Sequence, residues 1–133
     1  MACSLFDEHY RPEVFMYFHQ TWPRGQLVVC SPEGRVLGFI NGVLCGDGAA
    51  RVMLLGVNRM MRGLGLGPRL LKEFEARAVM EGCQRITLEL RASKQRLLAF
   101  YLRNGFVAEA MLPAYYSDGE DGVSMSKPIQ LNI

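Results

Sequence analysis

The amino-acid sequence predicts a single mixed α/β domain, residues 1–133, in which helices flank a central, mostly antiparallel sheet. Half of the 133 residues are hydrophobic, which is enough for one packed core and too many for a disordered chain. Strand-like and amphipathic helix-like segments alternate along the chain, with turn residues between them. The predicted order is helix, three antiparallel strands, helix, strand, helix and two strands.

The first half of the chain contains one predicted helix and three predicted strands. A short helix is expected to begin near Asp7, which is a good N-cap residue, and to end before Trp22-Pro23. The segments 27–30 and 36–44 form a predicted hairpin, and a third strand covers 50–57. The turns between these strands are Pro32-Glu33-Gly34 and Gly46-Asp47-Gly48.

The second half alternates helices and strands. A helix that ends near Gly82 is predicted by an apolar stripe, which consists of Leu70, Leu71, Phe74, Ala78 and Val79. Apolar and polar residues alternate over 86–91, as they do in a strand. Ser93 is expected to cap a further helix that closes at Asn104-Gly105. Two final strands are expected at 106–112 and 123–126, with a loop at 115–122 between them.

Charge and cysteine content narrow the class of protein. The net charge of +2 is small and the basic residues are scattered, which argues against a nucleic-acid groove. The four cysteines form no CxxC pair and no cluster with His at metal spacing, so we expect no metal and a reducing compartment. We see no signal peptide and no apolar run of the roughly 20 residues that would span a membrane. A cytoplasmic protein with no membrane partner is expected.

A glycine-rich segment lies between the third predicted strand and the second predicted helix. It reads Arg62-Gly63-Leu64-Gly65-Leu66-Gly67, and Pro68 follows where the first turn of a helix tolerates proline. Glycines allow the backbone to turn tightly and to bring its N–H groups close to an anion, and a helix N-terminus adds partial positive charge. A pyrophosphate group suits this geometry, and Arg62 and Arg69 can add charge. The alternative is a tight turn with no ligand.

The spacing of the glycines excludes two other phosphate-binding loops. A P-loop requires Lys-Ser or Lys-Thr after its last glycine, and neither is present. The GxGxxG fingerprint of dinucleotide-binding folds is out of step by one residue. The remaining pattern, Arg-x-x-Gly-x-Gly, resembles the pyrophosphate-binding loop of the GNAT acetyltransferases.

Further segments extend this resemblance over roughly residues 50–127, whereas the first 48 residues match only loosely. They are 88–93 (LELRAS), 100–106 (FYLRNGF) and 115–122 (YYSDGEDG), followed by Met125. The segment 115–122 is similar to the tail of one branch of this family, the ribosomal-protein-alanine and related protein N-terminal acetyltransferases. The resemblance implies a GNAT-like sheet, acetyl-CoA as co-substrate, and transfer to a primary amine, most simply the N-terminal α-amino group of a protein or peptide.

The same resemblance implies which residues bind the cofactor. The backbone of the third strand would pair with the pantetheine arm in the manner of an added strand, through Leu55, Gly56 and Val57. The pyrophosphate would bind the loop formed by Arg62, Gly63, Leu64, Gly65, Leu66, Gly67 and Pro68. Lys94 stands where the family commonly has Asn, and it could reach a phosphate instead.

Two residues are candidates for catalysis. The resemblance implies that Glu89 accepts the proton of the amine, through a water, and that Tyr101 donates a proton to the departing sulfur. From the residues alone, Glu89 is equally well an exposed strand carboxylate paired with Arg91 or Lys94, and Tyr101 a core residue of an amphipathic helix. A terminal amine has a pKa near ~8, against about 10.4 for lysine, so it needs less help from a base.

The remaining expectations concern the residues that hold the acceptor and the effect of the short N-terminus on the sheet. Tyr115 and Tyr116 would hold the acceptor peptide through their phenols, with Phe6 beside them, although either tyrosine could simply pack under the loop. The resemblance implies a first strand that this short N-terminus lacks, so 27–30 would be an edge strand. Either a partner covers this edge, as in a homodimer, or the reading frame starts upstream and the natural protein is longer. The alternatives are an acetyltransferase of lysine or a polyamine, and a non-catalytic acyl-CoA-binding module.

Overall fold

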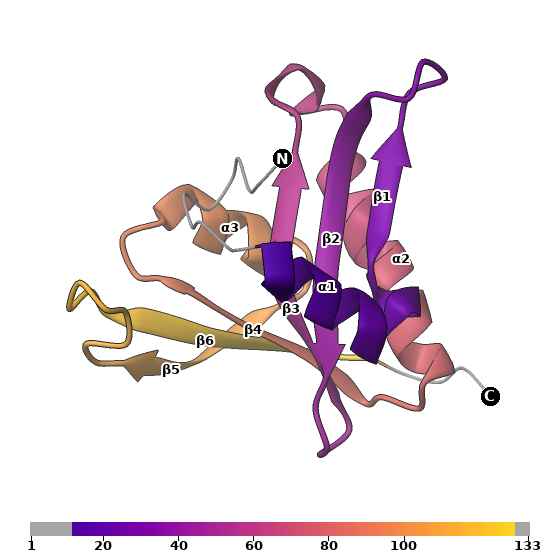
Figure 1. The fold of residues 1–133 in the computed structure, drawn as a ribbon. Coiled ribbons are helices and arrows are strands. Elements are labelled where there is room, and N and C mark those ends of the chain that lie inside the picture. The colour runs from indigo at the N-terminus through magenta and orange to yellow at the C-terminus, as the bar shows by residue number, and fades with distance from the viewer. Residues whose placement is uncertain (1–11, 130–133) are drawn as a thin grey trace.

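The computed structural model describes residues 12–129 and contains the predicted order of helices and strands (Figure 1). Two short 3-10 helices, η1 and η2, are additional. The elements are α1 (Pro12–Thr21), η1 (Pro23–Gly25), β1 (Leu27–Cys30), β2 (Val36–Leu44), β3 (Ala49–Val57), η2 (Arg59–Met61), α2 (Leu66–Met80), β4 (Arg85–Arg91), α3 (Gln95–Arg103), β5 (Val107–Leu112) and β6 (Gly122–Pro128). The predicted mixed α/β fold is therefore confirmed.

The six strands form one sheet in the order β1-β2-β3-β4-β6-β5. Every neighbouring pair is antiparallel except β3 and β4, which are parallel. The parallel pairing covers only three positions, from Ala49 opposite Arg85 to Arg51 opposite Thr87. Beyond Arg51 the two strands diverge, so that the sheet opens into a V between β3 and β4 (Figure 1).

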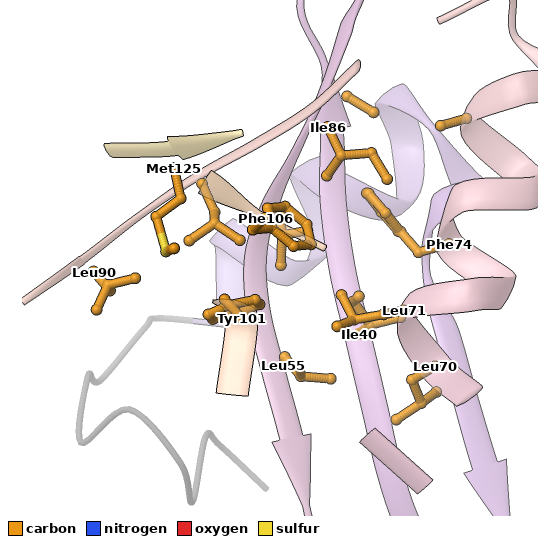
Figure 2. Packing of buried hydrophobic residues seen from close by; sticks show 14 of the residues in the cluster. Ile40, Leu55, Leu70, Leu71, Phe74, Ile86, Leu90, Tyr101, Phe106 and Met125 are labelled. Atoms are coloured by element: carbon orange, nitrogen blue, oxygen red, sulfur yellow. The ribbon is translucent and has the colours of Figure 1, made fainter. Parts of the chain in front are cut away.

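Helices cover both faces of the sheet. Helix α1 crosses one face, and Phe18 packs there with Phe39 and Leu54 in a small hydrophobic cluster (Figure 1). The larger core lies on the opposite face, beneath α2 and α3, and Phe74 and Tyr101 are among its most buried side chains (Figure 2). The two layers together fix the position of each strand at the V.

Strand β4 carries different chemistry on its two faces. Ile86, Leu88 and Leu90 are no more than 2% exposed and belong to the larger core, where Figure 2 labels Ile86 and Leu90. The residues between them alternate to the other face, because successive side chains of a strand point in opposite directions. Glu89 and Arg91 are therefore presented on the face away from the larger core, where both are partly exposed.

The start predicted for α3 differs from the observed one, whereas Pro68 lies in the first turn of α2 as expected. Ser93 does not cap α3; the N-cap position is Lys94, and the Ser93 amide donates to Glu120 Oε2 at 2.9 Å instead. A loop that is distant in the sequence takes this amide, which local capping signals cannot reveal. Helix α2 begins at Leu66, inside the glycine segment, with Gly65 as its N-cap. Asp7 lies outside the described residues.

Strand β1 is at one edge of the described sheet and pairs with β2 only. The prediction of an edge strand at 27–30 is confirmed for the part of the chain that the structure describes. The Val28 side chain on this strand is 57% exposed. The segment that precedes Pro12 lies outside the description.

Candidate active site

A cavity of about 620 Å³ lies where the N-termini of α2 and α3 approach each other. Most of the predicted cofactor-binding residues line it, namely Val57, Arg62, Gly63, Gly65, Leu66, Gly67, Pro68 and Lys94. Three predicted residues do not line it. Leu55 and Gly56 are buried within β3, and the Leu64 side chain is 68% exposed outside the cavity.

Gly63 and Gly65 form an open backbone cradle at this cavity. Their φ angles are +81° and +83°, in the left-handed region that favours glycine. A Cβ atom built on either residue would meet no atom within 4 Å, so the backbone faces open space. Gly67 differs, because a Cβ there would lie 3.1 Å from the Phe100 ring. Its lack of a side chain therefore allows α2 to pack against α3.

The cavity is strongly basic. Arg62, Lys94, Arg96 and Arg103 line it, and none of its described lining residues is acidic. The N-terminus of α2 adds backbone N–H groups and the positive end of the helix dipole. Arg96 and Arg103 were missed in the sequence, although they are seven residues apart and therefore share one face of α3. The whole arrangement suits an extended, anionic ligand.

The V between β3 and β4 adjoins this cavity. Residues 55–57 of β3 pair with β2, where Leu55 is opposite Ile40 and Gly56 is opposite Phe39. The pairing of β3 with β4 ends earlier, at Arg51. The β4-facing side of residues 55–57 is thus the side that looks into the V, where the sequence predicted a ligand arm bound like a strand.

A second, small cavity of about 50 Å³ contains the two predicted catalytic residues. It is lined by side chains of β3, β4, α3 and the loop after β5, which are Val52, Met53, Leu88, Glu89, Leu90, Arg91, Lys94, Leu97, Tyr101 and Tyr116. Glu89 points away from the larger core, whereas Tyr101 is part of that core. Both residues nevertheless line this small cavity at the V. Lys94 and Leu97 also line the large cavity, so the two cavities are neighbours.

Tyr101 belongs both to the hydrophobic core and to the small cavity. It is 1% exposed, and its ring makes edge contacts with Phe100 and Phe106 at centroid distances of 5.2 and 5.3 Å. Figure 2 shows Tyr101 beside Phe106. The interpretation of this tyrosine as a core residue is therefore correct, and it does not exclude the catalytic one, because the same residue lines the cavity beside Glu89.

Glu89 is bonded to Arg51 of β3, and not to Arg91 or Lys94 as an exposed strand carboxylate was expected to be. The Arg51 Nε donates to Glu89 Oε1 at 2.7 Å, and the Arg51 Nη2 donates to Tyr115 Oη at 3.2 Å. Burial lowers the pKa of Arg51, but the charge and hydrogen bond of Glu89 outweigh it and raise the pKa overall. No local sequence signal indicates this contact, because the two residues are 38 positions apart.

Arg91 organises the loop that follows β5. Its Nη1 donates to Asp118 Oδ2 at 2.8 Å and to Glu120 Oε1 at 3.0 Å, and its guanidinium lies 4.3 Å from the centre of the Tyr116 ring. Hydrogen bonds from the Glu120 amide and then from Arg91 lower the pKa of Asp118. Hydrogen bonds from Ser93 and Arg91 likewise lower the pKa of Glu120. Tyr116 is thus held at the rim of the small cavity.

Tyr115 lies beside Tyr116 and is 45% exposed. The two rings meet edge to face at 5.1 Å. A Cβ atom on Gly122 would lie 3.1 Å from the Tyr115 ring, so this glycine makes room for it. Phe6, the third residue predicted to contact the acceptor, lies outside the described residues.

Within residues 12–129 the structure contains no helix that is long and apolar enough to cross a membrane. The same residues contain no group of three or more His, Cys, Asp or Glu side chains arranged to hold a metal ion. Cys30, Cys45 and Cys83 are free thiols. Burial is the main cause that raises the pKa of Cys83.

A sheet that opens at two parallel strands, a basic glycine cradle and an adjoining small cavity lined by Glu89 and Tyr101 suit a protein that binds an extended anionic ligand. The chain belongs to the acetyltransferase (GNAT) family, whose model matches residues 2–106. It is an acetyl-CoA-dependent N-acetyltransferase. The match begins well before residue 50, so the resemblance covers more of the N-terminal part than the sequence motifs indicated.

Individual relatives agree with this assignment. The chain is 35% identical over 125 residues to an uncharacterized N-acetyltransferase of Methanocaldococcus jannaschii, covering 93% of this chain and 79% of the relative. It is 31% identical to the N-alpha-acetyltransferase MAK3 of Arabidopsis thaliana, covering 91% of this chain and 67% of the relative. The solved structure of Ard1 from Thermoplasma volcanium superposes with a TM-score of 0.88 at 30% identity, covering 96% of this chain and 86% of that one. The predicted family and branch are confirmed.

Proposed function

We propose that this protein transfers the acetyl group of acetyl-CoA to the N-terminal α-amino group of a protein or peptide, by direct attack within a ternary complex. The observation that carries the proposal is the meeting of the two cavities at Lys94 and Leu97. A ligand in the basic cavity then ends beside the cavity that contains Glu89 and Tyr101. The similarity to an N-alpha-acetyltransferase supports the choice of acceptor.

The residues of the large cavity fit the co-substrate. Acetyl-CoA supplies an acetyl group activated as a thioester. The cradle of Gly63 and Gly65 and the N-terminus of α2 would bind its pyrophosphate, and Arg62, Lys94, Arg96 and Arg103 would neutralise its phosphates. The side of β3 that faces the V would bind its extended arm.

Two protons move in the proposed reaction. As the bond from nitrogen to the acetyl carbon forms and the carbon–sulfur bond breaks, Glu89 accepts one proton from the amine through a water and Tyr101 donates one to the sulfur. A phenol, with a pKa of about 10, is protonated at neutral pH and can donate. A terminal amine, with a pKa near ~8, needs only a modest acceptor, and Glu89 in its bond with Arg51 is one.

The charges at the small cavity favour a peptide N-terminus over a polyamine. A polyamine site needs surplus negative charge, but the described carboxylates here are bonded to arginines. Glu89 is bonded to Arg51, and Asp118 and Glu120 are bonded to Arg91. Tyr115 and Tyr116, at the rim, would instead donate to and accept from the backbone of an acceptor peptide.

The test is thiol release from acetyl-CoA with peptides that differ in their first residue and contain one internal lysine. Each peptide is paired with a copy whose α-amine is blocked. We expect turnover with free peptides and almost none with blocked ones. Equal turnover of both members of each pair would contradict the proposal and would indicate a lysine acetyltransferase. No turnover with any amine, despite acetyl-CoA binding, would also contradict it and would favour an acyl-CoA-binding module.

A further inference from the structure

Arg51 stands at the point where the sheet opens. It is the last residue of β3 that pairs with β4, and its partner in the register is Thr87. Glu89 lies two residues further along β4 and therefore on the same face as Thr87. The side chains of Arg51 and Glu89 are 34% and 19% exposed, so their ion pair is only partly screened by water. The fold itself brings this cation to the proposed proton acceptor.

The Arg51 guanidinium bridges two functional groups. Nε donates to Glu89 Oε1 at 2.7 Å, and Nη2 lies 2.5 Å from the same oxygen and also donates to Tyr115 Oη at 3.2 Å. Its planar fork of donors fixes both directions at once, which a lysine ammonium cannot do. The proposed acceptor of the proton and a proposed contact of the peptide are thus joined through a single side chain.

Tyr115 has a defined seat in this arrangement. Its ring packs over Gly122, the first residue of β6, where a Cβ would lie 3.1 Å away. Gly122 is paired with Arg91, the last residue of β4. The phenol is therefore supported from the neighbouring strand, while its hydroxyl is directed to Arg51. A contact built from both sides in this way is more than a chance meeting of surface side chains.

We propose that Arg51 is a positioning residue of the acetyl transfer: it holds the Glu89 carboxylate in a fixed orientation, and it couples that carboxylate to the Tyr115 phenol that meets the acceptor. The inference deepens the proposed function and rests on it. It predicts that removal of one side chain changes both kcat and the apparent affinity for the acceptor.

Several charged and titratable groups surround Glu89. They come from β3, β4, the start of α3, α3 itself and the loop after β5, and are Arg51, Arg91, Lys94, Tyr101, Tyr115 and Tyr116. Arg91 is bonded to Asp118 and Glu120. The hydrogen bond to the Glu89 carboxylate comes from Arg51. Removal of Arg51 should therefore be felt at Glu89 more than any change elsewhere in this group.

The expected effects of Arg51→Met follow from the loss of its hydrogen bonds to Glu89 and Tyr115. The kcat should fall by about 10- to 100-fold, part of what a proton-transferring group contributes, because Glu89 loses the donor that orients it. The KM for the peptide should rise, because Tyr115 loses its partner.

Two further variants separate charge from geometry. Arg51→Lys keeps the positive charge but lacks the planar fork of donors, so it should leave both the kcat lowered and the peptide KM raised. Tyr115→Phe removes only the second hydrogen bond, so it should raise the peptide KM while the kcat stays close to that of the wild type. Because the two effects share one contact, the KM changes of Arg51→Met and Tyr115→Phe should be smaller together than their sum.

The experiment measures the kcat and the peptide KM of these variants and of a matched control, Arg85→Met. Arg85 is the first residue of β4 and forms an exposed pair with Asp47 at 2.6 Å, away from both cavities. Its removal should leave the kcat and the peptide KM unchanged. Calorimetry with CoA checks that each variant keeps a folded cofactor site. If Arg51→Met does not bind CoA, Arg51→Gln replaces it.

An unchanged kcat and peptide KM in an Arg51 variant that binds CoA would overturn the role of Arg51 while leaving the proposed function intact. Conversely, a wild-type protein that acetylates only lysine side chains would contradict the proposed function. The role of Arg51 would then be decided from the kcat and the KM measured with that lysine acceptor.

Discussion

The ring of Tyr101 packs between Phe100 and Phe106, and the same residue lines the small cavity beside Glu89. A buried ring fixes the position of the phenol, and a fixed donor loses little entropy when the reaction occurs. The structural role of Tyr101 and its proposed catalytic role are compatible for this reason. Glu89 is fixed differently, by its bond to Arg51.

The donor and the acceptor can be tested by nearly isosteric changes. Tyr101→Phe removes only the hydroxyl, so kcat should fall by about 100-fold or more while CoA affinity stays the same. Tyr17→Phe is the matched control, because Tyr17 is 58% exposed on α1. Thiol-release kinetics and calorimetry give the two quantities. Full activity of Tyr101→Phe would exclude it as the donor.

Glu89→Gln keeps the shape of the side chain and removes its charge. The rate should fall most at low pH, where few acceptor amines are free bases and a proton acceptor matters most. The measurement is the rate between about pH 6 and 9 at saturating acetyl-CoA, a range that brackets the pKa of a terminal amine. If the rate of Glu89→Gln equals that of the wild type at every pH, Glu89 only holds Arg51 and Tyr115 in place.

The sequence identified some of these residues and missed others for a physical reason. Glu89 and Tyr101 lie in continuous motifs, LELRAS and FYLRNGF, and a motif is visible without a fold. The partner of Glu89 is supplied by parallel pairing of β3 with β4, which joins residues 38 positions apart. Arg96 and Arg103 reach the large cavity only because α3 packs beside α2.

At the level of elements, the start of α2 determines where the anion would bind. The helix begins at Leu66 with Gly65 in the left-handed conformation as its N-cap. The glycine segment was correctly predicted to lie at a strand-to-helix junction, and η2, just before it, was not foreseen. The start of α3 was misplaced by one residue, because Glu120 binds the Ser93 amide.

Replacement of Gly65 tests the cradle. In Gly65→Val the positive φ is unfavourable for a branched side chain, and the side chain would project into open space at the large cavity. We expect a loss of stability of about 1–3 kcal/mol together with a loss of at least about tenfold in CoA affinity. Thermal unfolding and calorimetry measure the two effects separately.

Gly34→Val provides a matched control for this strain. Gly34 has a φ of +86° and lies in the turn between β1 and β2, where a Cβ atom would meet nothing within 4 Å. The variant should lose similar stability and keep its CoA affinity. An equal loss of CoA affinity in both variants would show that strain, and not obstruction of the cradle, causes the effect.

At the scale of the whole molecule, the sequence predicted the order of the elements and the mostly antiparallel sheet. It did not predict that β3 and β4 are parallel over only three positions and then diverge. Local patterns specify which segments are strands, whereas the pairing of β3 with β4 depends on how α2, which connects them, packs on the sheet. The two cavities lie next to each other at the V between these strands.

The exposed edge of β1 bears on whether the whole molecule associates with a second copy. An exposed edge can pair with another chain. We expect sedimentation at micromolar concentration to detect self-association, and amide exchange at residues 27–30 to slow as the protein concentration rises. A monomer at every concentration, with protected amides at these residues, would mean that this chain covers its own edge.

The most direct test of the central claim asks whether both cavities form one continuous site. The ligand is a conjugate in which the sulfur of CoA is joined through an acetyl group to the α-amine of a short peptide. The control conjugate is joined through the ε-amine of a lysine in the same peptide. Calorimetry compares both conjugates with CoA alone.

We expect the α-linked conjugate to bind about 100-fold or more tightly than CoA, because linking two ligands of adjacent sites makes the second binding event intramolecular. The ε-linked conjugate should bind much less tightly than the α-linked one. An α-linked conjugate that binds no better than CoA would contradict the claim that the cavities at Lys94 and Leu97 form a single acetyl-transfer site for a peptide N-terminus.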